Sequence, residues 1–276
     1  LRWSKRHGIG DRNTKLLVYE TLIGMWPLDD RELPAVRDRL KQYMEKAARE
    51  AKRQTSWIAP NREYEETLLG FCDAILSDET FCADLARFQK RTAFYGFLNA
   101  LGQVVLKAAA PGAPDVHQGT ELWDFSLVDP DNRRPVDYPR REAMLKALKT
   151  GFSVETLLRR WQDSRIKMFV TWKTLEARTR HTDLFRDGSY EPVDSGRNIC
   201  AFIRRHEDDA VLVAVPRLIA SLVKPGTFPI GNVWGDASLR VSGKWRNVFT
   251  GDEHEGSSLP LRDVFARFPV AVLEKG

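Results

Sequence analysis

One connecting segment collects most of the side chains in this chain that could do chemistry. Residues 119–138, GTELWDFSLVDPDNRRPVDY, contain one Glu, four Asp and two adjacent Arg. Paired carboxylates are what cleavage or transfer of a glycosidic bond requires, because one group protonates the leaving oxygen while the other attacks or stabilises the sugar cation. The carboxylates available for such a pair are Glu121, Asp124, Asp129, Asp131 and Asp137.

The same residue types support two further interpretations. Carboxylates that pair with Arg133 and Arg134 and cap proline-containing turns would hold a long loop rigid. Alternatively, the ring of Trp123 would stack on a pyranose while Asp, Asn and Arg side chains hydrogen-bond its hydroxyls. Spacing alone favours the structural interpretation first, sugar binding second and catalysis third.

No residue pattern predicts a metal, a nucleotide or another cofactor. The stretch DPDN begins like a calcium loop, but Arg134 and Arg140 stand where an EF-hand needs Gly and Glu. The five histidines are scattered without ligand spacing, and a phosphate-binding glycine loop and a G-x-S-x-G elbow are absent. We therefore predict no cofactor and no metal ligand.

Charge and hydropathy restrict the partners and the compartment. The net charge is +5, and the charged face within residues 37–53, RDR…K…EK…RE…KR, interleaves both signs. Interleaving at helical spacing is typical of a solvated surface and not of a nucleic-acid site. The sequence shows no apolar window of about 18 residues and no leader pattern, and its three cysteines lack C-x-x-C spacing. We expect a cytoplasmic protein with reduced thiols and without nucleic-acid or membrane partners, and its first residue, Leu1, suggests a piece of a longer chain.

The elements that must position the charged segment change type along the chain. Apolar residues recur at helical spacing up to about residue 180, with Pro34 at the start of one helix and Asn61 as the cap of the next. The stretch PGAPDVHQG, residues 111–119, cannot be a helix and is expected to hold a short strand. From about residue 186 the apolar residues recur with a period of two, as in strands. Two apolar runs flank the polar stretch HEDD, which predicts a hairpin.

This order of elements predicts α/β plus all-β: the C-terminal part of a (β/α)8 barrel with a helical insertion, followed by an antiparallel β-sandwich domain. We expect a helical subdomain and late barrel helix at residues 1–110. Residues 111–185 are expected to hold the last barrel strand, the substrate-site loop and closing helices. The β-sandwich domain is expected at residues 186–276.

Four stretches together resemble one family over essentially the whole chain. They are PGAPDVHQGTELWDFSLVDPDNRRPVDYPRR from residue 111, DRNTKLLVYETLIGMWP from residue 11, DSRIKMFVTWKTLEAR from residue 163, and WRNVFTG…LPLRDVFARFPVAVL from residue 245. They resemble the C-terminal portion of the maltooligosyl trehalose synthases, which are members of the alpha-amylase superfamily of glycoside hydrolases.

The resemblance implies an isomerase, a (1->4)-alpha-D-glucan 1-alpha-D-glucosylmutase of trehalose biosynthesis. Such an intramolecular transglucosylase converts the reducing-end α-1,4 linkage of a maltooligosaccharide into an α,α-1,1 linkage. The family's catalytic carboxylates precede the matched segments, the last of them in an H-D-T-K-R-x-E-D motif that this sequence lacks. We therefore assign no catalytic residue and predict that this fragment alone is inactive, with the N-terminal part of the same chain as the partner that it lacks.

Matched motif positions imply residues that line or support the sugar pocket. They are Gln118, Glu121, Trp123, Asp124, Asp129, Asp131, Asn132, Arg133, Arg134 and Asp137, with Arg12, Asn13 and Tyr19 from the first segment. His117 departs from the family's usual Tyr, which puts a direct sugar contact at that position in doubt.

Two alternatives stay open: a non-catalytic carbohydrate-binding or scaffold module, and a fragment of a maltooligosyl trehalose hydrolase. A homodimer of the fragment that covers open strand edges is also expected.

Overall fold

The computed structural model describes residues 11–276, which form two compact units. The first, here called the helical unit, comprises residues 11–92 and Asp124–Pro135 in the described part of the chain. The second, the sheet unit, comprises Ala93–Trp123 and Val136–Gly276. The charged segment is thus divided, since its middle belongs to the helical unit and its two flanks to the sheet unit. The domain boundaries predicted at residues 110 and 185 remain predictions.

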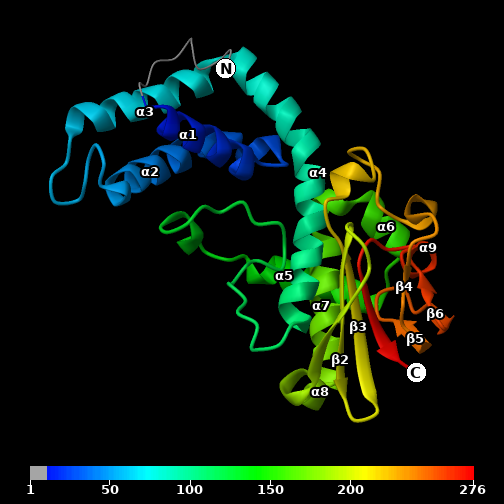
Figure 1. The fold of residues 1–276 in the computed structure, drawn as a ribbon. Coiled ribbons are helices and arrows are strands. Elements are labelled where there is room, and N and C mark those ends of the chain that lie inside the picture. The colour runs from blue at the N-terminus through cyan, green and yellow to red at the C-terminus, as the bar shows by residue number, and fades with distance from the viewer. Residues whose placement is uncertain (1–10) are drawn as a thin grey trace. The chain divides into compact units, whose positions relative to one another are not determined.

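The helical unit is built on three amphipathic helices and the first half of a fourth, drawn in blue to cyan (Figure 1). Asp11 caps the first helix by accepting from the N–H groups of Asn13 and Thr14, and Asn61 caps the third, as predicted, by accepting from Tyr64. Apolar side chains of all four helices form one core that includes Leu22, Leu40, Phe71 and Phe81. The helices are α1 Arg12–Met25, α2 Leu33–Ala51, α3 Arg62–Ser77 and α4 Glu79–Ala109.

One sequence expectation for helix α2 is wrong. Its charged face is not simply solvated, because Arg39 is only 9% exposed. Lys41 pairs with Asp73, and Arg49 pairs with Glu65, which is also buried. Ion pairs with other elements compensate the desolvation that would otherwise keep these charges in water.

The sheet unit combines helices with antiparallel strands. Its six-stranded sheet has the order β1-β2-β3-β8-β5-β6, and β4 pairs with β7 in a separate two-stranded sheet. The strands are β1 Ser189–Val193, β2 Ile199–His206, β3 Asp209–Pro216, β4 Ser238–Leu239, β5 Gly243–Asn247, β6 Glu253–Gly256, β7 Leu259–Pro260 and β8 Ala271–Lys275. The helices after α4 are α5 Tyr138–Thr150, α6 Val154–Arg159, α7 Arg165–Arg180, α8 Thr182–Asp187 and α9 Leu261–Val264.

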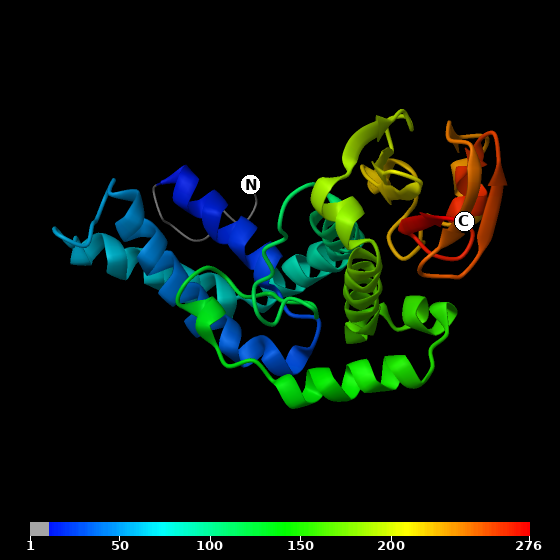
Figure 2. The ribbon, with the colours of Figure 1, turned by 90° about the horizontal axis from the view of Figure 1, so that it is seen from below.

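The alternation of side chains in β3 explains why the middle of the sheet is buried on both faces. Val211 and Val213 belong to a core shared with Phe169 of α7, whereas Leu212 and Ala214 belong to a second core on the opposite side. Figures 1 and 2 show α7 running along β2 and β3. The register of β2 on β3, with His206 opposite Asp209, confirms the predicted hairpin.

Residues 111–118, expected as a barrel strand, enter no ladder with any strand in the part of the chain that the structure describes. A strand in the middle of a parallel barrel is defined by its neighbours on both sides, and residues 11–276 supply none beside that stretch. No helix among residues 11–276 is long and apolar enough to cross a bilayer.

Candidate functional site

The charged loop, Asp124–Pro135, is held by helix α2 through a buried ion pair. Arg39 Nε donates to Asp131 Oδ1 at 2.9 Å and an Arg39 Nη donates to Asp131 Oδ2 at 2.8 Å, with both residues 9% exposed. The same Nη donates to the carbonyl of Phe125 at 2.6 Å. Asp131 Oδ2 also accepts from the N–H of Leu127 at 2.7 Å, so one carboxylate closes the turn of the loop and binds it to the helix.

The surroundings of Asp131 keep it ionised. Burial alone would raise the pKa of its carboxyl, but the guanidinium of Arg39 and the N–H of Leu127, both donating to it, hold that pKa below its ordinary value. A carboxylate whose oxygens are occupied in this way is unavailable as a nucleophile or a proton donor. The contacts of Asp131 hold the backbone of the loop.

A second contact joins the loop to α2 about two turns further along the helix. Lys46 Nζ donates to the carbonyl of Asp129 at 2.7 Å and to its Oδ2 at 3.2 Å. Arg134 reaches back within the loop, where its Nε donates to the Asp131 carbonyl at 3.0 Å and an Nη donates to Ser126 Oγ at 2.9 Å. Arg133 pairs with Asp129 but stays 77% exposed. The side chains of Asp124, Arg133 and Arg134 are nevertheless exposed to solvent.

Asn132 lies on the 3-10 turn Asp131–Arg133 with its Oδ1 buried and without a hydrogen-bond partner among the described residues. A buried acceptor without a donor is uncommon in native proteins.

The two flanks of the loop meet in the sheet unit. Arg141 of α5 donates from Nε to Glu121 Oε1 at 2.5 Å and from Nη to the Gly119 carbonyl at 2.9 Å and the Asp137 carbonyl at 3.0 Å. Asp137 caps α5 by accepting from the Arg140 N–H at 3.0 Å. One arginine thus fixes the chain on both sides of the loop. Gly119 has φ 89°, a backbone conformation that favours glycine.

Other predicted residues of the sheet unit are packed or solvated. Trp123 donates from Nε1 to the Trp161 carbonyl at 2.7 Å, and its ring centroid lies 4.7 Å from that of Phe97. Gln118 is exposed, and its Oε1 accepts from the Tyr138 hydroxyl at 3.3 Å. His117 is exposed as well, and only its carbonyl is engaged by a neighbouring side chain, the hydroxyl of Thr120 at 2.7 Å.

The residues predicted from the first segment lie on α1. Arg12 and Asn13 are exposed at its N-terminus, whereas the ring of Tyr19 packs at 6.2 Å from Phe71 and 5.8 Å from Phe81 in the helical core. Burial raises the pKa of the Tyr19 hydroxyl, which has no hydrogen-bond partner in the described part of the chain. Tyr19 is therefore placed differently from the loop residues, in a core.

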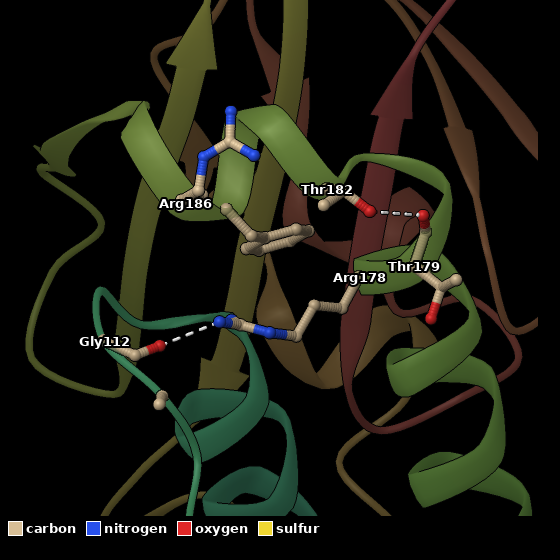
Figure 3. A pocket seen from close by; sticks show the side chains of 7 residues that line it. Gly112, Arg178, Thr179, Thr182 and Arg186 are labelled. Carbon is tan, nitrogen blue, oxygen red and sulfur yellow. Dashed lines mark hydrogen bonds between the residues drawn. The ribbon is translucent and has the colours of Figure 1, made fainter.

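A cavity that sequence reasoning missed lies in the sheet unit between the segment that follows α4 and the helices α7 and α8 (Figure 3). It has a volume of about 490 Å³, and Figure 3 shows Arg178 directed to the Gly112 carbonyl, to which it donates at 2.8 Å. Its walls include Thr179, Thr182 and Phe185. Its lining residues come from two stretches of the chain, 112–113 and 178–186, which are 65 positions apart, so no local sequence pattern could predict the cavity. None of the predicted site residues lines it. No group of side chains among residues 11–276 is arranged to hold a metal ion.

Comparison with known proteins places these features in context. No family model matches the sequence. The chain is 35% identical over 268 residues to a provisionally named maltooligosyl trehalose synthase of Mycobacterium tuberculosis, covering 95% of this chain and 32% of that protein.

Solved structures agree with the sequence comparison. Maltooligosyltrehalose synthase from Arthrobacter ramosus is 29% identical with a TM-score of 0.80, over 100% of this chain and 34% of that one. A protein of Sulfolobus tokodaii, described as a hypothetical maltooligosyl trehalose synthase, is 26% identical with a TM-score of 0.70, over 99% of this chain and 34% of that one. The chain spans about a third of the length of the relatives that it matches.

Proposed function

We propose, from the premise that this chain is homologous over nearly its whole length to maltooligosyl trehalose synthases, that it forms part of the sugar pocket of such an enzyme. The reaction is the intramolecular transglucosylation that turns the reducing-end α-1,4 linkage of a maltooligosaccharide into an α,α-1,1 linkage. The single observation that carries the proposal is the match of 95% of the chain to about one third of these proteins.

The geometry of the charged loop supports sugar binding. Asp124, Arg133 and Arg134 offer carboxylate and guanidinium groups to solvent from a backbone that α2 holds in place. Carbohydrate hydroxyls are both donors and acceptors, so exposed groups of both kinds on a fixed loop suit them.

The architecture proposed with this function is the end of a (β/α)8 barrel. Residues 111–118 would be its last strand, and α7 would be among its closing helices, with the helical unit as an insertion and β1–β8 as a terminal β-sandwich. A strand without its ladder neighbours leaves an unpaired edge. We therefore propose that the remaining part of the enzyme pairs with residues 111–118, and that the isolated chain associates into a dimer, which gel filtration would test.

The three free thiols, Cys72, Cys82 and Cys200, support a reducing, cytoplasmic compartment for this enzyme.

Calorimetric titration of the chain with maltopentaose tests the sugar pocket. We expect millimolar binding without turnover, because the chain lacks the family's catalytic motif, and we expect Arg133→Ala to weaken binding several-fold. Arg87→Ala is the matched control, since Arg87 is similarly exposed, at 73% against 77%, and pairs with a carboxylate three residues away on its own helix. Absence of binding would refute the sugar pocket, and formation of maltotriosyl trehalose would refute the inactivity of the chain.

A further inference from the structure

Two cations of helix α2, Arg39 and Lys46, reach the charged loop from 92 and 83 residues away in the sequence. We propose that they are the positioning residues of this loop, so that the helical unit sets the conformation in which the loop meets a maltooligosaccharide. This inference rests on the function proposed above for the loop.

Arg39 controls both sides of the loop's turn. Its guanidinium occupies both oxygens of Asp131 and the carbonyl of Phe125, and the same carboxylate holds the N–H of Leu127. Removing the guanidinium leaves a buried carboxylate without its counter-ion, and that charge can regain water only if the turn opens. The contact therefore selects one loop conformation.

The loop's own ion pairs are too exposed to do this alone. The side chain of Arg133, which pairs with Asp129, is 77% exposed, and that of Arg134, which pairs with Asp131, is 51% exposed. Exposed pairs contribute little because water competes for both charges. The side chain of Arg39 is only 10% exposed and that of Lys46 is 27% exposed. The contacts that fix the conformation of the loop are therefore those that it makes with α2.

A separate observation also ties the loop to the helices. Leu127, in the middle of the loop, packs against the apolar core that Leu40 and Met44 of α2 help to form. The loop is thus a part of the helical unit in its packing as well as in its charges. Asp124, Arg133 and Arg134, the groups offered to sugar, are carried on that anchored backbone.

Amide hydrogen exchange of the chain, resolved by residue, tests the role of Arg39. In Arg39→Met we expect the amides of Leu127, Asp131 and Arg133 to exchange at least about tenfold faster, since a charge-assisted hydrogen bond to each side of the turn is lost. Arg39→Lys should recover part of the protection, because an ammonium keeps the charge but lacks the planar fork that spans two oxygens.

Arg37→Met is the control on the same helix. Arg37 donates to Asp73 and Ser77 of α3 and forms no hydrogen bond or ion pair with the loop among the described residues, so its loss should leave exchange of the loop amides unchanged. Equal loop exchange in Arg39→Met and Arg37→Met would overturn the proposal. If Arg39→Met does not fold, Lys46→Met decides, with faster exchange confined to residues 128–131 as the expected result and wild-type exchange there as the refuting one.

Titration with maltopentaose separates this inference from the proposed function. If the wild-type chain binds the sugar, Arg39→Met should bind at least about fivefold more weakly and Arg37→Met equally well. Equal affinity in Arg39→Met would overturn the positioning role. If the wild-type chain binds no maltopentaose, the proposed function fails, while the exchange data still decide whether Arg39 sets the conformation of the loop.

Discussion

His181 is held between two carboxylates where helix α7 meets the sheet, and this predicts a specific dependence of stability on pH. Its Nδ1 lies 2.6 Å from Oδ2 of Asp209, the first residue of β3, and its Nε2 lies 3.2 Å from Oε1 of Glu274 in β8. Arg180 also pairs with Glu274 and with Glu176 of its own helix. Only a protonated imidazole can donate to both carboxylates.

These contacts raise the pKa of His181. The hydrogen bond to Glu274 is the largest cause, burial opposes it, and the hydrogen bond to Asp209 adds to it. The unfolded chain loses this proton near pH 6.5, whereas the folded protein keeps it to higher pH. The stabilisation is therefore complete below about pH 6.5 and is lost as the pH rises through the folded pKa.

The size of the stabilisation by charged His181 follows from how exposed its two partners, Asp209 and Glu274, are to solvent. The Asp209 side chain is 39% exposed, so its contact contributes at most about 1 kcal/mol, as a surface pair does. The Glu274 side chain is 19% exposed, which places its contact near the low end for a charge-assisted hydrogen bond, about 1–1.5 kcal/mol. The sum of about 2 kcal/mol corresponds to a change of roughly thirtyfold in the unfolding equilibrium constant.

Urea unfolding of the wild type and of His181→Ala at pH 6 and pH 9 measures this contribution. The methyl NMR signals of Leu212 and Val213 report on the sheet unit alone, which matters because the two units need not unfold together. We expect the variant to be less stable by about 2 kcal/mol at pH 6 and by less than about 1 kcal/mol at pH 9, where a neutral imidazole donates only once.

A second histidine provides a control of opposite sign. Burial lowers the pKa of His254 in β6. Its contribution to the free energy of unfolding is therefore present above about pH 6.5 and is lost as the pH falls through the pKa in the folded protein. Replacing His254 should therefore reduce the decrease in the free energy of unfolding that occurs as the pH falls below about 6.5. A destabilisation by His181→Ala that is the same at pH 6 and pH 9 would refute the assignment of a charged His181.

Four further outcomes are expected. Gly188→Ala should destabilise the sheet unit by about 2–3 kcal/mol in urea unfolding, because its Cβ would meet two backbone carbonyl oxygens at 2.3 and 2.7 Å. Gly70→Ala, in open space on helix α3, should instead stabilise the helical unit by about 0.5–1 kcal/mol. Burial raises the pKa of the Cys72 thiol to about 12, so iodoacetamide at pH 8 should label it only after unfolding, and mass spectrometry would reveal any earlier labelling. Arg204→Met should destabilise the sheet unit by about 3 kcal/mol or more in urea unfolding, since this buried guanidinium donates to five backbone carbonyls. Arg205→Met loses only an exposed ion pair and should cost less than about 1 kcal/mol in the same urea experiment.

The parts of the fold that local chemistry determines could be predicted from the sequence. Asn61 caps α3 as expected, and the change of period near residue 186 falls close to Ser189, where β1 begins. The apolar runs around HEDD form β2 and β3, because alternating side chains and a two-residue turn specify a hairpin without reference to distant residues. Here propensity, period and turn chemistry agree.

The contacts that hold the charged loop could not be predicted in the same way. Asp131 is fixed by Arg39, 92 residues earlier, on a helix face whose mixed charges predict a solvated surface. The sequence offered the nearby Arg133 and Arg134 as partners, and both do pair with loop carboxylates, but from exposed positions. Which arginine is buried depends on the packing of α2, and residue spacing within the loop carries no information about that packing.

Rigidity and the sugar binding that we propose are not competing explanations of this loop. Asp131 is committed to Arg39 inside the helical unit, while Asp124, Arg133 and Arg134 face water on the same backbone. A ligand that binds a loop already held in one conformation does not have to pay for ordering it, so the buried pair raises the affinity available to the exposed groups. Under the proposed function, the contact of Asp131 with Arg39 is therefore a condition for sugar binding by the exposed groups, and loss of Arg39 should weaken both.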